Sequence, residues 1–440
     1  MKISQAAEIE DLRKLAKKAL PRIIYDWIEE GAGDELAAQG NLNSFRQFRL
    51  LPRYMRDVSE RTQTVQLFGQ EYSSPIGFSP TGMQGLVHAG GELKMARAAV
   101  ADNIPYVMSG LTTVRLENVA EAAPSHLWYQ PYPTANRAII EDLLRRAADA
   151  GVKNLVLTAD LPVEGHRLRS IHNRRSGRPN PWLILEALRH PRWVANYLKR
   201  RPLLEDLLPY AAPGASRKDL DEMFGREYAP VRPKQTWSEI EWYRRLWSGK
   251  LIIKGIISPK DATSAVDLGV DGIVVSNHGG RQLDRAPAPL DMLPIIKMAV
   301  GDNVEVMLDG GIRTGSDVVI ALCLGARFVF IGRAALFGLA AGGHEGVRRA
   351  IQILQAEIDV TMGQIGCTCI EQLSSDYLWQ KNSHEYGDIS HKASLLTGRR
   401  PDVSGGMTQP ESSAGLISVP NNIPVYGSLG STGATQHFGT

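Results

Sequence analysis

From about residue 75 onward, short apolar runs recur along the chain, and each is followed by a polar or glycine-containing turn and a stretch with helical spacing. This alternation predicts parallel strands joined by helices. Eight strands are predicted, at residues 76–79, 105–109, 127–130, 155–158, 251–254, 272–276, 305–309 and 328–332. Eight such units favour an α/β fold closed into a (β/α)8 TIM barrel, and an open doubly wound sheet is the alternative.

Two terminal segments differ from the barrel pattern. Residues 9–31 place apolar and charged positions at helical spacing and predict N-terminal helices outside the main fold. From about residue 397 the chain is rich in Gly, Ser, Pro, Thr and Asn, which favours an extended tail. We therefore expect an N-terminal helical segment over residues 1–55, a barrel domain over 56–378 and a C-terminal extension over 379–440.

An insertion of about residues 175–235 follows the fourth predicted strand. Within it, residues 181–202 combine apolar and aromatic side chains at helical spacing with a basic flank that includes Arg189, Arg192 and Lys199. The pattern is typical of a helix at a membrane surface or against a partner. A cap whose apolar side packs on the barrel mouth would give the same pattern, so both interpretations stay open.

Composition narrows the class of protein. Hydrophobic residues make up 43% and charged residues 22% of the 440 residues, as in globular domains, and a net charge of +3 does not indicate nucleic-acid binding. The three cysteines, Cys323, Cys367 and Cys369, form no C-x-x-C pair, so we expect reduced thiols and no metal site. The first 18 residues lack an apolar signal core, and no long apolar run predicts a spanning helix. These features predict a cytoplasmic protein.

Polar or glycine residues stand at every predicted strand end, which is where barrels carry their active sites. At the first strand, Gly82 would let the backbone approach a flat ligand closely. The next four strand ends supply Ser109, Gln130, Tyr132, Thr158, Asp160 and Lys254. Core packing alone does not require these residue types, so we expect a site on this face.

Glycine–arginine pairs follow the last two strands. Gly310 and Gly311 precede Arg313, and Gly332 precedes Arg333. This placement matches the phosphate site of barrels, where backbone N–H groups at the start of a short helix hold the anion. Tight turns between strand and helix would explain the same glycines without a ligand.

The sixth strand end carries the most specific combination. His278 is able to accept a proton near neutral pH, and Arg281 is able to grip a carboxylate in bidentate fashion. Asp160 is a candidate to orient the imidazole. A lone histidine after a strand is often structural, but its neighbours here favour a catalytic role.

The run SNHGGRQLD at residues 276–284, with residues 309–313 and 332–333, resembles the FMN-dependent α-hydroxy-acid dehydrogenase/oxidase family. The resemblance extends from about residue 25 to residue 378. Within the family, GHRLRSIHN at residues 165–173 and the stretch 365–367 most resemble bacterial (S)-mandelate and L-lactate dehydrogenases that pass electrons to the membrane.

The resemblance implies FMN-dependent oxidation of an L-2-hydroxy acid to the 2-keto acid. It makes His278 the base, with either the α-proton or the hydroxyl proton as its target, and Asp160 the carboxylate that orients it. The substrate carboxylate and hydroxyl oxygens would be held by Arg281, Arg167, Tyr25 and Tyr132. The implied flavin-binding residues are Pro80, Thr81, Gly82, Ser109, Gln130, Thr158, Lys254, Ser276, Asp309, Gly311, Arg313, Gly332 and Arg333.

The resemblance also implies a homotetramer, a quinone as electron acceptor and peripheral attachment to the inner face of the cell membrane. An oxidase of the same family, which uses O2 and releases hydrogen peroxide, is the alternative. Gly82, where many oxidases have Ala, resembles the dehydrogenase branch. Glu164 is unusual where the family commonly has apolar or neutral residues. Facing the cavity, it would disfavour a second anionic group on the substrate and favour a polar one; facing solvent, it would have no role.

Overall fold

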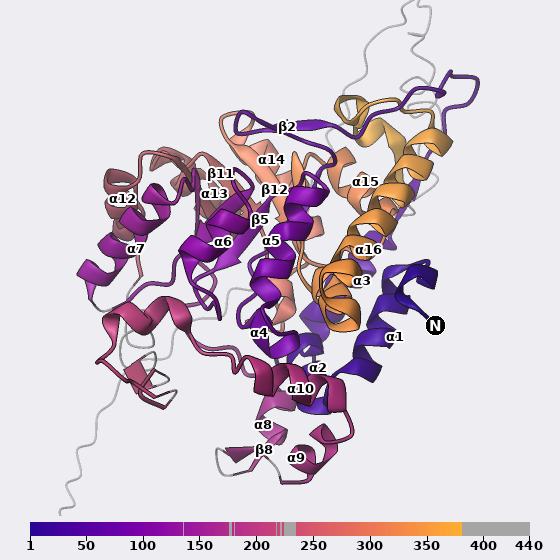
Figure 1. The fold of residues 1–440 in the computed structure, drawn as a ribbon. Helices are drawn as coiled ribbons and strands as arrows, with labels where there is room; N and C mark the ends of the chain where they lie inside the picture. Colours follow the sequence, from indigo (N-terminus) through magenta and orange to yellow (C-terminus); the bar gives the residue numbers. More distant parts are fainter. Residues whose placement is uncertain are drawn as a thin grey trace, which may run out of the picture. The chain divides into compact units, whose positions relative to one another are not determined.

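The computed structural model describes residues 1–134, 136–175, 178–179, 181–216, 218–220, 222–223 and 235–380. Eight parallel strands close into a barrel in the order β10-β11-β12-β13-β4-β5-β6-β7, which confirms the predicted (β/α)8 architecture (Figure 1). The strands are β4 (Ile76–Phe78), β5 (Tyr106–Ser109), β6 (Leu127–Gln130), β7 (Asn154–Thr158), β10 (Lys250–Ile256), β11 (Gly272–Val275), β12 (Glu305–Asp309) and β13 (Phe328–Ile331).

Large side chains fill the interior of the barrel. Strand residues that include Trp128, Ile252, Phe328 and Phe330 form one buried cluster. The hairpin of β2 (Val65–Leu67) and β3 (Gln70–Tyr72) contributes Val65, Leu67 and Tyr72 to the same cluster. The barrel is therefore a packed core and not a pore. Open space for a ligand lies at the carboxyl ends of the strands.

Helices surround the barrel and connect its strands. They are α5 (Gly91–Ala101), α6 (Leu116–Ala122), α7 (Arg137–Asp149), α12 (Trp237–Leu246), α13 (Pro259–Asp267), α14 (Pro289–Val300), α15 (Gly315–Cys323) and α16 (Arg333–Ile365). Local sequence sets several helix starts. Thr314 and Asp317 form a capping box at α15, and the Ser258 side chain accepts from the Asp261 amide at α13.

The N-terminal helices are α1 (Ile9–Ala19), α2 (Arg22–Glu29) and α3 (Leu36–Phe45). Helix α1 packs along α16, and the Arg349 side chain donates two hydrogen bonds to the Ala6 carbonyl. Strand β1 (Phe48–Leu50) pairs with β14 (Leu378–Gln380) in antiparallel register. These helices lie outside the strand barrel, but α2 reaches its mouth, as the lining of the cavity shows below.

The insertion after β7 runs through α8 (Leu168–His172), β8 (Arg174–Arg175), β9 (Arg178–Pro179), α9 (Pro181–Ala187), α10 (Pro191–Lys199) and the short 3-10 helix η2 (Glu205–Tyr210). Its return to the barrel is anchored by Asp206, which is buried and accepts from Arg146 at 2.6 Å. The Leu116 amide also donates to Asp206. In the described part of the chain, no helix is both long enough and apolar enough to cross a bilayer. The predicted C-terminal extension lies outside the described residues from residue 381 onward.

Candidate active site

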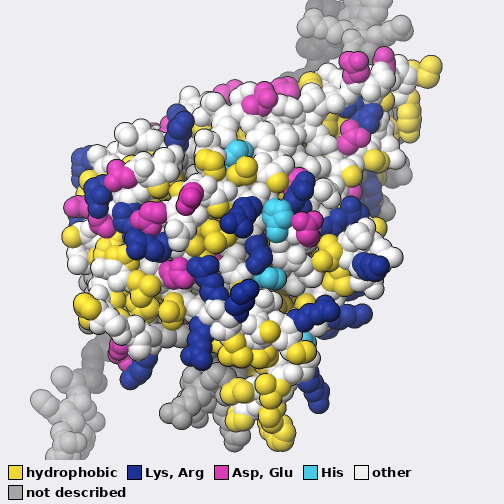
Figure 2. Space-filling model, viewed as in Figure 1, with side chains coloured by type: hydrophobic (Ala, Val, Ile, Leu, Met, Phe, Trp, Pro, Cys, Tyr) yellow, Lys and Arg dark blue, Asp and Glu magenta, His cyan; other side chains and the backbone are white. Residues whose placement is uncertain are grey.

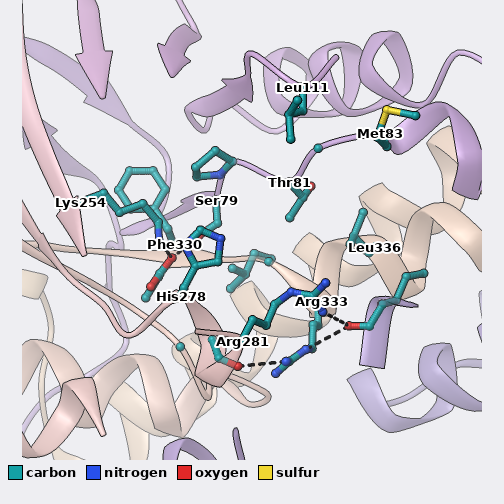
Figure 3. A pocket seen from close by; sticks show the side chains of 18 of the residues that line it. Ser79, Thr81, Met83, Leu111, Lys254, His278, Arg281, Phe330, Arg333 and Leu336 are labelled. Atoms are coloured by element: carbon teal, nitrogen blue, oxygen red, sulfur yellow. Dashed lines mark hydrogen bonds and ion pairs between the residues drawn. The ribbon is translucent and has the colours of Figure 1, made fainter. Parts of the chain in front are cut away.

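A cavity of about 460 Å³ opens at the carboxyl ends of the barrel strands (Figure 3). This volume is in the range of small-molecule and cofactor sites. Figure 3 shows Lys254 and His278 at one side of the cavity and Leu111 and Met83 at the other. The carboxyl ends of parallel strands all face the same end of a barrel, so residues distant in sequence meet here.

His278 is held by its neighbours in a specific orientation. Its Nδ1 lies 2.9 Å from Oδ1 of Asp160 at the end of β7. Burial by itself raises the pKa of the Asp160 carboxyl, but the adjacent His278 outweighs this effect, and the pKa lies below its usual range. An ionised Asp160 only accepts, so His278 donates from Nδ1, and in the neutral imidazole the lone pair is then on Nε2.

The backbone around His278 is unusual. His278 has φ of 58°, and the following Gly279 and Gly280 have φ of 67° and 73°. A residue with a side chain rarely adopts this left-handed conformation, and such positions cluster at functional sites. Two hydrogen bonds hold the turn: the His278 amide donates to Ser276 Oγ at 3.0 Å, and the Gly280 amide donates to Asn277 Oδ1 at 3.0 Å.

A buried charged cluster lies beside the histidine. Lys254 Nζ donates to Ser276 Oγ at 2.8 Å and lies 3.0 Å from Asp309. Burial by itself lowers the pKa of the Lys254 ammonium, but Asp309 and Asp160 outweigh this effect and raise the pKa. Ser79 Oγ donates to Asp309 Oδ2 at 2.8 Å, whereas Asp309 Oδ1 is buried with no hydrogen-bond partner. Lys254 therefore stays charged, and one carboxylate oxygen is available to a ligand.

Besides Arg167, three guanidinium groups line the cavity with little compensating charge. They belong to Arg281, Arg313 and Arg333. Burial and neighbouring cations lower the pKa of Arg281 to about 9 and that of Arg313 to about 10, and burial also lowers the pKa of Arg333. Among the described residues, only the Glu30 carboxylate lies within 4.0 Å of any of them, 3.8 Å from Arg281. Half-buried cations without a counter-ion are costly, so this arrangement suits anionic ligands.

The structure brings most of the predicted site residues to this cavity. The lining includes Pro80, Thr81, Gly82, Tyr132, Arg167, Lys254, His278, Arg281, Asp309, Gly311, Arg313, Gly332 and Arg333. Asp160 and Ser276 join it through their hydrogen bonds to His278. Ser109, Gln130 and Thr158 are not among the lining residues, but they end the adjacent strands β5, β6 and β7, and Gln130 Nε2 donates to Thr158 Oγ1.

The structure does not place the Tyr25 hydroxyl in the cavity. Tyr25 is not a lining residue, and its hydroxyl donates to Glu29 Oε1 at 3.3 Å, a carboxylate that also pairs with Arg13. Trp27 and Ile28 of the same helix line the cavity instead. In this structure Tyr25 is therefore outside the cavity lining, and its role toward the substrate carboxylate stays a prediction.

Several lining residues were not predicted to belong to the site. Ser79 and Met83 flank the predicted Pro80–Gly82 stretch, and Phe330 lies on β13. Leu336 comes from α16, and Leu204 comes from the insertion. Position next to a strand end was a usable signal for Ser79 and Met83, whereas nothing near Leu204 in the sequence indicates that it returns to the barrel mouth.

Comparison with known proteins identifies the family. Residues 16–380 match the family model described as FMN-dependent dehydrogenase. The chain belongs to this family. A member from Mycobacterium tuberculosis, which carries a provisional L-lactate dehydrogenase name, is 41% identical over 86% of this chain and 90% of its own length.

Solved structures of the family agree with this assignment. The monotopic membrane protein (S)-mandelate dehydrogenase is 36% identical, with a TM-score of 0.81 over 86% of this chain and 100% of that one. Mandelate oxidase, in complex with a fluorinated 2-hydroxy acid, is 33% identical, with a TM-score of 0.71 over 86% of this chain and 100% of that one. The chain is thus an FMN-dependent oxidoreductase with the fold predicted from its sequence.

The residues present fit FMN. The unpartnered Asp309 Oδ1 suits a ligand hydroxyl, and the cations Arg313 and Arg333 suit a phosphate. Between them, a Cβ atom on Gly311 would lie 2.1 Å from the Asn41 carbonyl oxygen, so only glycine is accommodated where this turn passes α3. Anion-binding groups and a tight glycine turn after strands seven and eight are typical of phosphate binding in barrels.

Proposed function

We propose that this chain oxidises an L-2-hydroxy acid of the lactate or mandelate type to the 2-oxo acid, with His278 as the base. The observation that carries the proposal is the His278–Asp160 pair beside uncompensated cations in one cavity. A base and an anion-binding group within one cavity are what removal of a proton next to a carboxylate requires. The names of the relatives supply the substrate class.

In this proposal, Arg281 and Arg167 hold the substrate carboxylate. Arg281 is fixed by hydrogen bonds to the carbonyls of Trp27 and Glu30, each at 2.9 Å. Arg167 donates to the Arg281 carbonyl and to Gln282 Oε1. These hydrogen bonds hold both guanidinium groups in place, so together they form a preorganised site for a carboxylate. Tyr132 lines the same cavity and would donate to the substrate hydroxyl oxygen.

His278 Nε2 takes the substrate proton, and Asp160 stabilises the imidazolium that results. Their 2.9 Å contact keeps the ring in the tautomer that has Nε2 free. FMN, when bound, accepts the electron pair of the oxidised C–H bond. Lys254, which donates to Ser276, would supply a positive charge to the flavin ring, and Pro80, Thr81 and Gly82 would contact it through their backbone.

Asp309, Gly311, Gly332, Arg313 and Arg333 hold the ribityl chain and phosphate in this proposal. Ser109, Gln130 and Thr158 bound the ring from the ends of three neighbouring strands.

We propose a quinone as the electron acceptor, with O2 as the alternative because mandelate oxidase has the same fold. A Cβ atom on Gly82 would lie 2.9 Å from Leu111 Cβ, so this position has no room for Ala without a shift of Leu111.

Steady-state turnover of glycolate, L-lactate, L-mandelate and longer L-2-hydroxy acids should be measured with a soluble quinone and with O2. Turnover with quinone and little peroxide supports the proposal, and stoichiometric peroxide without quinone dependence favours the oxidase.

We also propose peripheral attachment to the membrane through α9 and α10. Their apolar side chains are divided between packing and exposure. Trp193 Nε1 donates to the Leu86 carbonyl at 2.8 Å and fixes α10 on the barrel mouth. The side chains that remain exposed are Trp182 (75%), Ile184 (56%), Leu185 (54%), Leu188 (64%) and Leu198 (60%).

Figure 2 shows hydrophobic side chains gathered over this part of the molecule, with Lys and Arg side chains next to them. An exposed apolar face with a basic border is typical of helices that lie in a membrane interface. Trp193 therefore supports the interpretation of residues 181–202 as a cap packed on the barrel. The exposed apolar face of α9 supports the interpretation as a membrane-docking surface.

A further inference from the structure

Glu164 lies in the loop between β7 and α8, and the cavity lining includes it. Its side chain is also exposed, so it stands at the rim where the cavity meets solvent. Apart from Asp309, which pairs with Lys254, the other charged side chains in the lining are cations, so the Glu164 carboxylate has the opposite sign.

Hydrogen bonds fix the loop on both sides of Glu164. Gln282 Nε2 donates to the carbonyls of Asp160, at 3.1 Å, and Val163, at 2.9 Å. On the other side, the Gly33 amide donates to the His166 carbonyl at 2.9 Å. The backbone at position 164 is therefore held at the rim and does not depend on the Glu164 side chain.

The loop also lies directly against the turn that carries the catalytic base. A Cβ atom on Gly165 would lie 2.1 Å from the Arg281 carbonyl oxygen, so only glycine permits this approach. Arg281 follows His278 by three residues in the same turn. Glu164 is thus positioned relative to the carboxylate-binding and proton-accepting groups by contacts of its loop backbone, and not by its own side chain.

The Glu164 carboxylate has no counter-ion in the described part of the chain. The only other carboxylate in the lining, Asp309, pairs with Lys254 and Ser79. No ion pair or hydrogen bond of the Glu164 side chain to any described residue exists, not even to Arg167 three positions on, which donates to Gln282 instead. Its negative charge is available to whatever occupies the cavity.

Apolar side chains form the wall near this rim. Leu161, Leu204 and Tyr132 pack in one cluster, with Met83 and Leu111 against it. All five also line the cavity. A substrate side chain would therefore meet apolar surface along its length, and a negative charge where the cavity opens.

We propose that Glu164 is a specificity-determining residue, which rejects 2-hydroxy acids with a second carboxylate and favours those whose side chain ends in a positively charged or hydrogen-bond-donating group. The inference rests on the proposed function, because it assumes that the substrate carboxylate occupies Arg281 and Arg167. Selection against a wrong charge is a common source of specificity. Because Glu164 is exposed, solvent screens its charge, and we expect effects of about fivefold per unit of substrate charge.

The test compares wild type with Glu164→Gln on three substrates of similar length: L-2-hydroxyglutarate, its 5-amide and L-4-amino-2-hydroxybutyrate. The variant should raise kcat/KM for the dianion about fivefold relative to the amide and lower it for the cation by a similar factor. In wild type, added NaCl should weaken both the discrimination against the dianion and the preference for the cation. Glu121→Gln is the control, because Glu121 is an exposed carboxylate on α6 that does not line the cavity.

Equilibrium binding separates this inference from the proposed function. Binding of 2-oxoglutarate and its 5-amide to the oxidised holoenzyme is followed by the change in flavin absorbance. The quantity compared is the dissociation constant of 2-oxoglutarate divided by that of its 5-amide. A fall of about fivefold in this ratio in Glu164→Gln supports the inference, even where no 2-hydroxy acid reduces the flavin and the proposed function fails. A ratio that changes by less than twofold, in binding and in turnover alike, overturns it.

Discussion

His278 Nδ1 and Asp160 Oδ1 lie 2.9 Å apart, although 118 residues separate them in the chain. The contact joins the end of β7 to the turn after β11 and points the remaining lone pair of the imidazole away from the carboxylate. The nearby His278 and Lys254 both favour the ionised form of this buried carboxylate. The geometry leads to predictions for each member of the site.

The first prediction concerns the base. His278→Gln should retain FMN and lose about 100- to 10,000-fold in turnover, because the amide cannot take a proton. Absorbance gives the flavin content, and turnover is measured with a dye as electron acceptor. Turnover within tenfold of wild type, in protein with full flavin content, would remove His278 from the proposed role.

The second prediction concerns the group that orients the base. Asp160→Asn should lower turnover about 100-fold, because a neutral amide no longer stabilises the imidazolium. The measurement is kcat over a range of pH. Loss of flavin binding with unchanged turnover per flavin would contradict the assigned role.

Asp160 also predicts a pH dependence of stability. Its pKa is lower in the folded protein than in the unfolded chain, so its contribution to stability is present above pH 3.8 and is lost as the pH falls through the folded pKa. The difference in unfolding free energy between wild type and Asp160→Asn should therefore shrink below about pH 4. Urea unfolding between pH 6 and pH 3 measures it, and a difference that grows on acidification would contradict the sign.

The third prediction concerns the phosphate cations. Arg313→Gln should weaken FMN binding about 10- to 100-fold, because a charge-assisted contact to phosphate is lost. The matched control is Arg327→Gln, since Arg327 precedes β13 and lies at the opposite end of the barrel. Fluorescence titration of apoprotein with FMN gives both affinities. Equal affinities in the two variants would argue against a phosphate site at Arg313.

The fourth prediction separates two residues of helix α2. Tyr25→Phe should leave KM within about twofold of wild type, because its hydroxyl bonds Glu29 outside the cavity. Trp27→Ala should raise KM several-fold, because the indole lines the cavity beside Arg281. The opposite ranking of the two variants would restore the role that the sequence predicted for Tyr25.

The fifth prediction concerns membrane attachment. The double variant Trp182→Ser/Leu188→Ser should sediment less with phosphatidylglycerol-containing vesicles and keep its turnover with a soluble dye. The control is Met298→Ser on α14, a side chain with 82% exposure far from the insertion in sequence. Cosedimentation of the double variant equal to that of the control would contradict the proposed docking surface.

The strands of the fold were predictable because buried parallel strands appear as short apolar runs. The structure places all eight within one or two residues of the predicted positions. The site followed from the rule that barrels function at their strand ends, which located His278, Lys254 and Arg333 without knowledge of their contacts.

Two features were beyond this rule for physical reasons. Position in a helix decided between Tyr25 and Trp27, and both are amphipathic aromatic residues, so the sequence pattern does not show which faces the barrel. Leu204 reaches the cavity from the insertion, and two residues further on Asp206 accepts from Arg146 of α7. A tertiary contact of this kind leaves no local pattern.

Anaerobic mixing of the oxidised holoenzyme with L-lactate or L-mandelate, followed by flavin absorbance, tests the central claim most directly. The proposal predicts bleaching of the flavin by an L-2-hydroxy acid, no bleaching by its D-enantiomer, and loss of the reaction in His278→Gln protein that still contains FMN. Flavin that stays oxidised with every 2-hydroxy acid, or that is reduced equally fast in His278→Gln, would contradict it.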